Sequence, residues 1–368
     1  LNAVARATDA ADTADLSSRT VSSITLDHRG AVWIGTDEGL NFYTNGNTYQ
    51  FYADITNPKS LLDSDVSNVI STPDRSVVAL TASGLSFYNE LSFDFTQVPL
   101  DSLPTGLFLD PVTDQYWVAT EKSGIAVVNK KKENIANFRT DPLNPLSIST
   151  SDFEDINKGN LNFSSDKKVY IGTRNGFNVF DRSLKTFKRY FQRAGSPLIS
   201  SHIKALCELD NDSLLVITDL GVNVYNTSTD EFEEEYTLFE TPVISVTPIE
   251  GERFIVQTRQ GVSLTVITRS RRSLNVTEKF ISSGPADEAF VKSGEIFVSS
   301  GRQLKVFSTK PEYKGRYELS APITSIQKVS SGLAVGTLDG LYTINTSDKV
   351  VKSKANNSLL YVHTDKSM

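Results

Sequence analysis

The segment Trp33-Ile34-Gly35-Thr36-Asp37-Glu38-Gly39-Leu40 combines a short apolar run, a threonine, two acidic residues and a glycine followed by leucine. Apolar and β-branched residues in such a run favour a buried strand. A glycine two or three residues later accommodates the positive φ that a tight hairpin turn requires. The segment is therefore expected to form a strand, a turn and the start of a second strand.

Close variants of this segment recur along the chain. The equivalent copies begin at Val78, Trp117, Tyr170, Leu215, Ile255, Phe297 and Ala334, and the copy at Phe297 is degenerate. Their turn glycines lie on average about 43 residues apart, within the range of roughly 40 to 50 residues that propeller blades show. Short alternating segments precede and follow each copy, so each repeat is expected to contain four antiparallel strands.

A single four-stranded repeat cannot bury both of its faces, whereas radial stacking of several repeats buries both and leaves only short edges. Eight repeats account for most of the 368 residues, whereas seven would leave a good copy unexplained. The sequence therefore predicts an all-β fold, a single β-propeller with eight four-stranded blades, with seven blades as the alternative. Residues 16–350 are assigned to the propeller, 1–15 to a leader or linker, and 351–368 to a closing strand, placed at Ser358–His363, or an exit linker.

Composition restricts the partners and cofactors. The net charge is -7 and the sequence pI about 5.2, which argues against nucleic-acid phosphates and anionic lipid as partners. Cys207 has no second cysteine for an intramolecular disulfide. Only three histidines occur and none has a metal-ligand spacing, so we expect no metal and no other cofactor. We recognise no signal peptide or membrane-spanning run, which favours a cytosolic protein or a mature, soluble piece of a longer one.

The first copy carries a family resemblance. Its pattern Val21-x-Ser23-Ile24-x-x-Asp27-x-x-Gly30-x-x-Trp33-Ile34-Gly35-Thr36-x-x-Gly39-Leu40-x-x-Tyr43 resembles the two-component-regulator propeller repeat. The segments 54–62 and 141–147 are similar to the segment that joins blades in that family. The resemblance extends over roughly residues 16–350 and is weak in the sixth and seventh copies.

The resemblance implies a function. Propellers of this family form the periplasmic sensor region of hybrid two-component systems in Bacteroidetes, where they help to recognise glycans or their breakdown products. It implies a non-catalytic domain that binds an oligosaccharide and signals through downstream domains of the same receptor, commonly a second propeller, an immunoglobulin-like domain, a membrane helix and a kinase. A homodimer formed through the full-length receptor is a further expectation.

The candidate ligand-binding residues occupy the turns between the second and third strands. These turns share one face of a propeller with the inter-blade connections, where ligands usually bind. Their polar side chains are suited to hydrogen bonds with sugar hydroxyls, although turn chemistry alone also selects such residues. The candidates are Asp37, Glu38, Glu121, Lys122, Arg174, Asn175, Arg259, Gln260 and Asp339.

Two alternatives remain open from the residues alone. A propeller glycoside hydrolase or lyase would need two carboxylates near the axis, and Asp152, Glu154, Asp155, Asp287 and Glu288 precede inner strands. A protein-interaction scaffold would need no small-molecule pocket, and the fold alone does not separate these functions.

Several other residues are given structural interpretations. Trp33 and Trp117 are expected to pack between blades, and the acidic run 230–235 to protect an exposed edge strand. The basic residues Lys130–Lys132, Arg269, Arg271 and Arg272 are expected to be solvated loop charges or to contact a neighbouring domain.

Overall fold

The computed structural model describes residues 6–7, 16–44, 47–154, 156, 158–163, 167–210, 212–249, 252–270, 273–292, 294–310, 312–329, 332–345 and 350–352. The predicted closing strand Ser358–His363, together with Asp155, Arg271 and Arg272, lies outside these residues.

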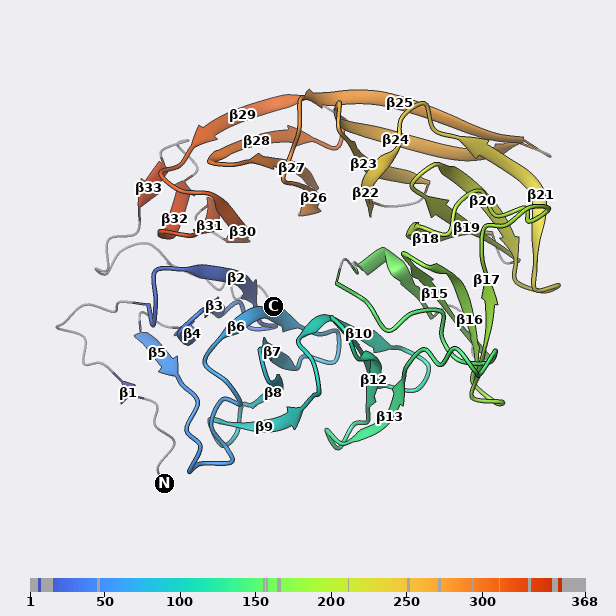
Figure 1. Ribbon diagram of the computed structural model, residues 1–368. Coiled ribbons are helices and arrows are strands. Elements are labelled where there is room, and N and C mark those ends of the chain that lie inside the picture. The colour runs from blue at the N-terminus through green and yellow to red at the C-terminus, as the bar shows by residue number, and fades with distance from the viewer. Residues whose placement is uncertain are drawn as a thin grey trace, which may run out of the picture.

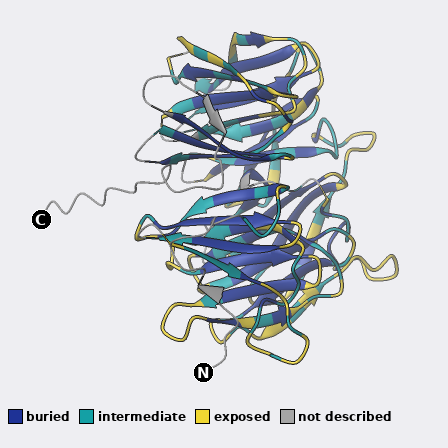
Figure 2. Cartoon of the chain, turned by 90° about the vertical axis from the view of Figure 1, so that its left-hand side faces the viewer, coloured by how far each residue is buried: buried dark blue, intermediate teal, exposed yellow. Residues whose placement is uncertain are grey.

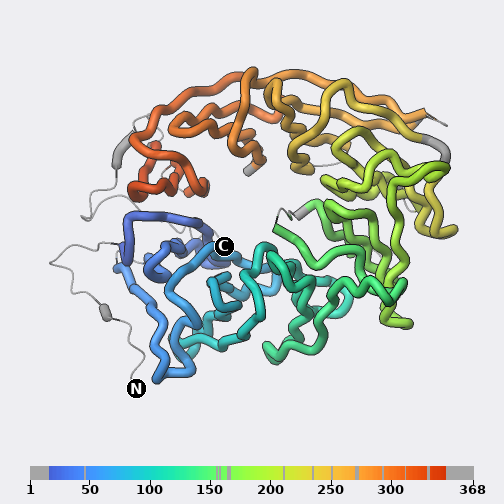
Figure 3. Tube along the Cα trace, in the orientation of Figure 1, coloured from blue at the N-terminus to red at the C-terminus, as the bar shows by residue number. Residues whose placement is uncertain are grey.

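The described chain forms eight antiparallel sheets, each with four strands in sequence order from the axis outward, and the first sheet has a fifth strand, β1 (Arg6–Ala7), at its outer edge. The trace runs once around a ring, so that the last sheet meets the first (Figures 1 and 3). This confirms the predicted eight-bladed β-propeller and excludes seven blades. Among the described residues, the single helical segment is a short 3-10 turn at Lys158–Asn160.

The strand bounds follow the repeat. The first four blades contain β2 (Val21–Leu26), β3 (Val32–Thr36), β4 (Gly39–Thr44), β5 (Asn47–Phe51); β6 (Val66–Ser71), β7 (Val77–Thr81), β8 (Gly84–Asn89), β9 (Asp94–Pro99); β10 (Pro104–Asp110), β11 (Gln115–Thr120), β12 (Gly124–Val128), β13 (Asn134–Phe138); and β14 (Leu161–Asn162), β15 (Lys168–Thr173), β16 (Gly176–Asp181), β17 (Thr186–Tyr190). The last four blades contain β18 (Ile203–Asp210), β19 (Ser213–Thr218), β20 (Gly221–Asn226), β21 (Glu231–Leu238); β22 (Val243–Pro248), β23 (Arg253–Thr258), β24 (Gly261–Ser270), β25 (Ser273–Ser283); β26 (Glu288–Lys292), β27 (Glu295–Ser300), β28 (Gln303–Ser308), β29 (Tyr313–Glu318); and β30 (Ile323–Val329), β31 (Gly332–Thr337), β32 (Gly340–Asn345), β33 (Val350–Lys352).

The apolar core is divided among the blade boundaries. The described buried residues form eight clusters, and each cluster joins two adjacent blades. The middle strands of each blade are the most buried, whereas exposed residues gather at the loops (Figure 2). Trp33 and Trp117 are almost fully buried in two of these clusters, which confirms their predicted packing role.

The ring closes through side-chain packing between the eighth and first blades. Val21 and Ile24 of β2 share a cluster with Val329 and Ala334 of the eighth blade. The Ile24 backbone N–H donates to Ser325 Oγ at 3.0 Å. The N-terminal strand β1 (Arg6–Ala7) pairs with β5 on the outer edge of the first blade, so it does not complete the eighth sheet. The fourth strand of the eighth blade is supplied by β33.

The ring has two faces with different loops. Turns between the second and third strands share one face with the inter-blade linkers, as the hydrogen bonds from Glu121 N to Leu103 O (2.8 Å) and from Gly124 N to Ser151 O (2.8 Å) show. We call this the linker face. Loops that join the first to the second strand, and the third to the fourth, lie on the opposite face.

Candidate functional site

The turns of the linker face are held by a recurring threonine. In seven blades, the hydroxyl of the threonine that ends the second strand donates to the carbonyl of the turn glycine. The Oγ1–O distances are 2.8 Å at Thr36, 3.0 Å at Thr81, 2.9 Å at Thr120, 2.8 Å at Thr173, 2.9 Å at Thr218, 3.3 Å at Thr258 and 2.8 Å at Thr337. The sequence analysis explained these threonines by the β-branched shape that favours strands and did not assign a role to the hydroxyl. The recurrence of threonine before every regular turn was the signal that could have indicated the hydrogen bond.

The turn glycine is required by a close approach as well as by its backbone angle. Gly124 has a φ of 81°, and a Cβ built there would lie 2.0 Å from the carbonyl oxygen of Phe138 in the outer strand. The turn of the third blade therefore holds residues 121–123 in a fixed position above the blade.

The predicted site residues lie where the repeat places them, on the linker face. Asp37, Glu38, Lys122, Arg174, Asn175, Arg259 and Gln260 are exposed, and Glu121 and Asp339 are partly exposed. Two of them are held by neighbours: Asn175 Nδ2 donates to Ser149 O at 3.0 Å, and Asp339 Oδ2 accepts from Ser320 Oγ at 3.2 Å.

The structure brings three of these residues together across the third and fourth blades. Lys122 Nζ lies 2.6 Å from Glu121 Oε1, and Arg174 Nη1 lies 3.3 Å from Asp152 Oδ2 and 3.7 Å from Glu154 Oε2. The hydrogen bond that Lys122 donates to Glu121 raises the pKa of Lys122, and the charges of Glu121, Glu154 and Asp152 add to this effect. We call the five residues of these ion pairs the linker-face cluster: Glu121, Lys122, Asp152, Glu154 and Arg174. Asn175 is on the fourth blade next to Arg174, and the other predicted residues are on the first, sixth and eighth blades.

The ion pairs of the linker-face cluster are exposed. Exposed pairs of this kind contribute little to stability, so a ligand can replace them at little cost. A planar guanidinium and an ammonium beside carboxylates offer donors and acceptors in one place, as a polyhydroxylated ligand requires.

Two of the carboxylates considered for catalysis, Asp152 and Glu154, lie beside the same guanidinium nitrogen of Arg174. Both carboxylates are therefore ion-pair partners within the linker-face cluster. The Asp287 carboxylate accepts a hydrogen bond from the backbone N–H of Gly301. Asp287 thus supports the degenerate seventh turn, at which Ser300 stands in the position of the usual threonine.

Charged residues on the opposite face join neighbouring blades. Arg29 of the first blade pairs with Glu90 of the second, and the Lys132 ammonium lies over the rings of Phe87 (4.2 Å) and Tyr116 (4.3 Å). Burial lowers the pKa of Lys132, and the charge of Asp74 only partly offsets this.

The same arrangement continues around the ring. Arg182 binds the fully buried Asp110 through both nitrogens, with Nη2 3.0 Å from Oδ1. Lys168 pairs with Asp230, and Arg269 with Glu233. Lys132 and Arg269 are therefore inter-blade contacts, and the expectation of solvated loop charge was wrong for both. Asp230 and Glu233 of the acidic run likewise connect blades.

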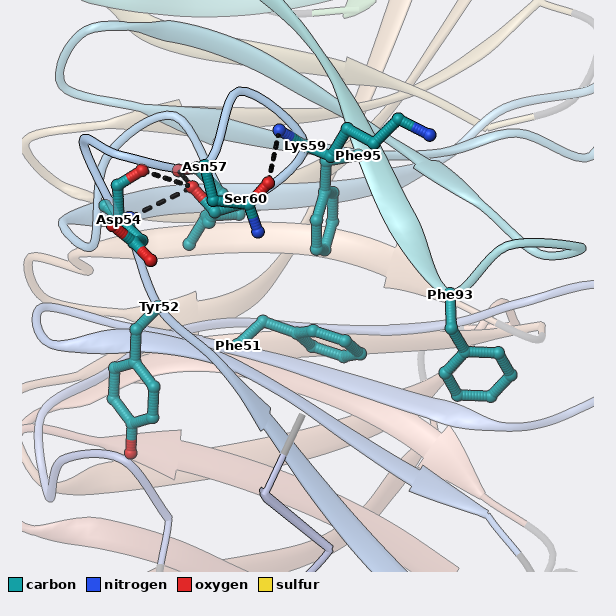
Figure 4. A pocket seen from close by; sticks show the side chains of 10 residues that line it. Phe51, Tyr52, Asp54, Asn57, Lys59, Ser60, Phe93 and Phe95 are labelled. Atoms are coloured by element: carbon teal, nitrogen blue, oxygen red, sulfur yellow. Dashed lines mark hydrogen bonds between the residues drawn. The ribbon is translucent and has the colours of Figure 1, made fainter. Parts of the chain in front are cut away.

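A separate pocket of about 270 Å³ lies at the outer rim between the first and second blades. We call it the rim pocket (Figure 4). Sequence reasoning missed it because its walls come from an outer strand end, a linker and a turn of the next blade. Its lining residues are Phe51, Tyr52, Ala53, Asp54, Asn57, Lys59, Ser60, Leu61, Phe93 and Phe95.

Residues 15–38 match the family model described as two component regulator propeller. The chain carries a two component regulator propeller repeat. This repeat spans the first two strands of the first blade and reaches Glu38, which confirms the family resemblance on the residues that carried it. No curated protein matches the sequence of this propeller.

Solved structures share the architecture of this propeller. One is the extracellular domain of a hybrid two component system from B. thetaiotaomicron, with 17% identity, a TM-score of 0.48, and coverage of 92% of this chain and 53% of that one. Another, the extracellular domain of a one component system from the same organism, has 17% identity, a TM-score of 0.50, and coverage of 91% and 49%. A streptogramin B lyase has 14% identity, a TM-score of 0.51, and coverage of 89% and 94%.

The propeller thus spans about half the length of the two extracellular domains. Identities this low show a shared fold, which enzymes and receptor domains both use. Among the described residues, no helix is long and apolar enough to span a bilayer, and no three or more His, Cys, Asp or Glu side chains gather as metal ligands.

Proposed function

We propose that this chain is a non-catalytic, ligand-binding propeller of a two-component signalling receptor, located in the periplasm and recognising a carbohydrate or its breakdown product. The observation that carries the proposal is the two component regulator propeller repeat in the first blade. The structural likeness to the extracellular domain of a one component system agrees with a receptor role, although that likeness establishes the fold alone.

The linker-face cluster is the proposed ligand contact. Glu121, Lys122 and Arg174 combine donors and acceptors beside an inter-blade linker, and their mutual pairs are exposed. The predicted turn residues Asp37, Glu38, Asn175, Arg259, Gln260 and Asp339 extend the same face around the ring. A ligand held there contacts the face on which the linkers also lie.

Signalling follows from differential binding. A bound ligand shifts the receptor only when it binds one arrangement of the propeller and its downstream domains more tightly than the other. The rigid ring transmits that preference to the domains that follow in the full-length chain. In the intact receptor, we further propose that the propellers come together as a homodimer.

Calorimetry against neutral and acidic oligosaccharides tests this function. We expect saturable binding by at least one compound, with affinity reduced at least tenfold in Arg174→Ala. The matched control is Arg316→Ala, an exposed arginine 3.8 Å from Glu318 on the outer strand of the seventh blade. The proposal is overturned when no oligosaccharide binds, or when both substitutions weaken binding equally.

A further inference from the structure

The rim pocket has rigid polar walls. The linker that follows β5 folds into two consecutive turns, in which Asn57 N donates to Asp54 O at 2.9 Å and Ser60 N donates to Asn57 O at 3.0 Å. Ser60 Oγ accepts the Asp54 N–H at 2.9 Å and closes the segment. The linker is fixed to the second blade by Phe95 N, which donates to Lys59 O at 2.9 Å.

Aromatic rings form the remainder of the rim pocket. Phe51 and Phe95 are buried, while Tyr52 and Phe93 keep 38% and 39% of their surface exposed. In Figure 4, Phe51 lies between Tyr52 and Phe93, and the polar linker residues follow one side. The pocket therefore has an apolar side with exposed ring faces and a polar side of backbone-fixed groups.

Phe93 is in an uncommon conformation for its residue type. Its φ is 56°, in the left-handed region where a bulky side chain is an outlier. Equivalent turn residues of other blades with positive φ are polar, namely Lys132, Lys185 and Asp230. Strained residues of this kind cluster at functional sites. Phe93 thus places an aromatic side chain on the pocket wall, where its ring also packs edge-to-face against Tyr49 and Tyr88, at a position where other blades carry a charge.

A second copy of the linker shows that these aromatics are not needed for the fold. Residues 141–147 repeat the same turns: Ser147 Oγ accepts the Asp141 N–H at 2.9 Å, and Phe187 N donates to Leu146 O at 2.9 Å. At the positions of Tyr52 and Phe93, this copy has Arg139 and Lys185. The same backbone therefore accepts basic side chains at both positions.

The polar side offers acceptors and a donor. Hydrogen bonds from Thr56 lower the pKa of Asp54, so its carboxylate is ionised at neutral pH. None of the described hydrogen bonds uses the Nδ2 amide of Asn57. Lys59 Nζ lies 3.0 Å from Asp94 Oδ2, so this lysine is already paired with a carboxylate. The pocket holds no unpaired cation among the described residues that would select an anionic ligand.

A pyranose ring matches both sides. One face of such a ring presents C–H groups, which meet the negative faces of aromatic rings, while its hydroxyls meet carboxylate and amide groups. The volume of about 270 Å³ lies just below the roughly 300–1,000 Å³ of pockets for drug-sized ligands, which fits one sugar ring rather than a longer chain.

We propose that the rim pocket binds one neutral pyranose ring, with Tyr52 and Phe93 as the stacking residues and Asp54 and Asn57 as the hydrogen-bonding residues. This inference rests on the proposed function for its ligand class, and it adds a second sugar contact at the outer rim, separate from the linker-face cluster of the third and fourth blades.

Saturation-transfer NMR with the methyl β-pyranosides of glucose, galactose and xylose, and with trisaccharides of each sugar, tests the assignment. We expect transfer to the C–H protons of one sugar face in at least one probe. The double substitution Tyr52→Arg and Phe93→Lys copies the second linker, so it should keep the thermal midpoint while weakening binding at least tenfold. Leu184→Arg, at an exposed turn of the fourth blade, serves as the control.

The outcomes separate the two proposals. The rim assignment is wrong if no neutral probe shows transfer, or if the double variant binds as the wild type does. Trisaccharide binding that survives in the double variant and is lost in Arg174→Ala would place the sugar on the linker face and leave the proposed receptor function standing. If an acidic oligosaccharide binds the protein and no neutral probe does, the rim assignment is wrong and the proposed receptor function stands.

Discussion

At the residue scale, a single hydroxyl organises each turn of the linker face. Thr218 is fully buried, donates to Gly221 O at 2.9 Å, and accepts the backbone N–H groups of Leu220 (3.2 Å) and Gly221 (3.1 Å). The threonine therefore satisfies three backbone groups at once. Because a valine has the same shape and lacks the hydroxyl, the contribution of these hydrogen bonds can be measured directly.

We expect Thr218→Val to lower the free energy of unfolding by about 1–3 kcal/mol, because buried donors and an acceptor lose their partner. Urea denaturation measures the change. The control is Thr229→Val on an exposed turn of the same blade, which should stay within about 0.5 kcal/mol. Equal effects of the two substitutions would contradict this role of the hydroxyl.

The buried pair between Asp110 and Arg182 makes a second residue-scale prediction. Burial alone would raise the pKa of Asp110, but hydrogen bonds from Arg182, Thr113 and the Val112 amide lower it below the ordinary 3.8. A lowered folded-state pKa gives stability that is complete above about pH 4 and is lost as the pH falls through the folded value.

We expect Asp110→Asn to cost about 3–5 kcal/mol at pH 7, because it leaves a largely buried guanidinium without its counter-ion. The difference from wild type should shrink as the pH falls from about 4 to 2, since the wild-type carboxyl is then protonated too. Chemical denaturation across this range measures it. Asp101→Asn, which removes an exposed partner of Arg139, should cost no more than about 1 kcal/mol; a constant difference for Asp110→Asn at all pH values would argue against the titration.

At the element scale, the turn glycines let the outer strand approach the hairpin. Gly124 and Gly195 have similar φ values of 81° and 78°, yet only Gly124 has a backbone oxygen in the way, whereas a Cβ at Gly195 would meet nothing within 4 Å. The two glycines thus separate the cost of the backbone angle from the cost of the steric clash.

Gly195→Ala should cost about 1–2 kcal/mol, from the left-handed conformation alone. Gly124→Ala should cost at least about 2 kcal/mol more, because the outer strand must move away from the new Cβ. Thermal unfolding monitored by circular dichroism gives both values. Equal losses would show that the outer strand yields freely, which would contradict the tight blade geometry.

The element scale also shows what the sequence could predict. Spacing and turn chemistry predict the eight blades, their strand order and the face on which the candidate turns lie, because each depends on contacts within one repeat. The contacts between blades could not be predicted in this way. Asp110 and Arg182 are 72 positions apart, and the sequence does not show that a buried aspartate of one blade meets a turn arginine of the next.

The same limit applies to the candidate site. The positions of Lys122 and Arg174 on one face follow from the repeat. Their proximity to Asp152 depends on the path of the linker between the third and fourth blades. The rim pocket needs Tyr52 and Phe93 from different blades, so neither residue is conspicuous alone. The recurrence of the linker at 54–60 and 141–147, with aromatic residues in one copy and basic residues in the other, was the available signal.

At the scale of the whole molecule, the boundary between the eighth and first blades lacks the linker that joins the blades at the other boundaries. A Cβ at Gly336 would lie 2.5 Å from Val21 Cγ1 at the closure, and a Cβ at Gly172 would lie 2.5 Å from Ile203 Cγ2 between the fourth and fifth blades. The two glycines thus offer the same steric test at an untethered and at a tethered boundary.

Each of Gly336→Val and Gly172→Val should overpack its boundary and cost about 1–3 kcal/mol. Gly336→Val should in addition accelerate limited proteolysis in the first and eighth blades, because no linker holds those blades together once their packing loosens. Mass spectrometry of the early fragments measures the difference. Identical cleavage patterns would indicate that the closure opens no more readily than the boundary between the fourth and fifth blades.

The closure has a consequence for assembly of the molecule during folding. A ring that opens between Val21 and Gly336 exposes two complementary surfaces, one on the first blade and one on the eighth. A second opened molecule can bind to these surfaces head to tail. Intramolecular closure wins in dilute solution because the two ends are covalently confined to a small volume. Refolding at high protein concentration should therefore shift material from monomeric rings to linked multimers, and the yield of monomer should fall with concentration although every blade is intact.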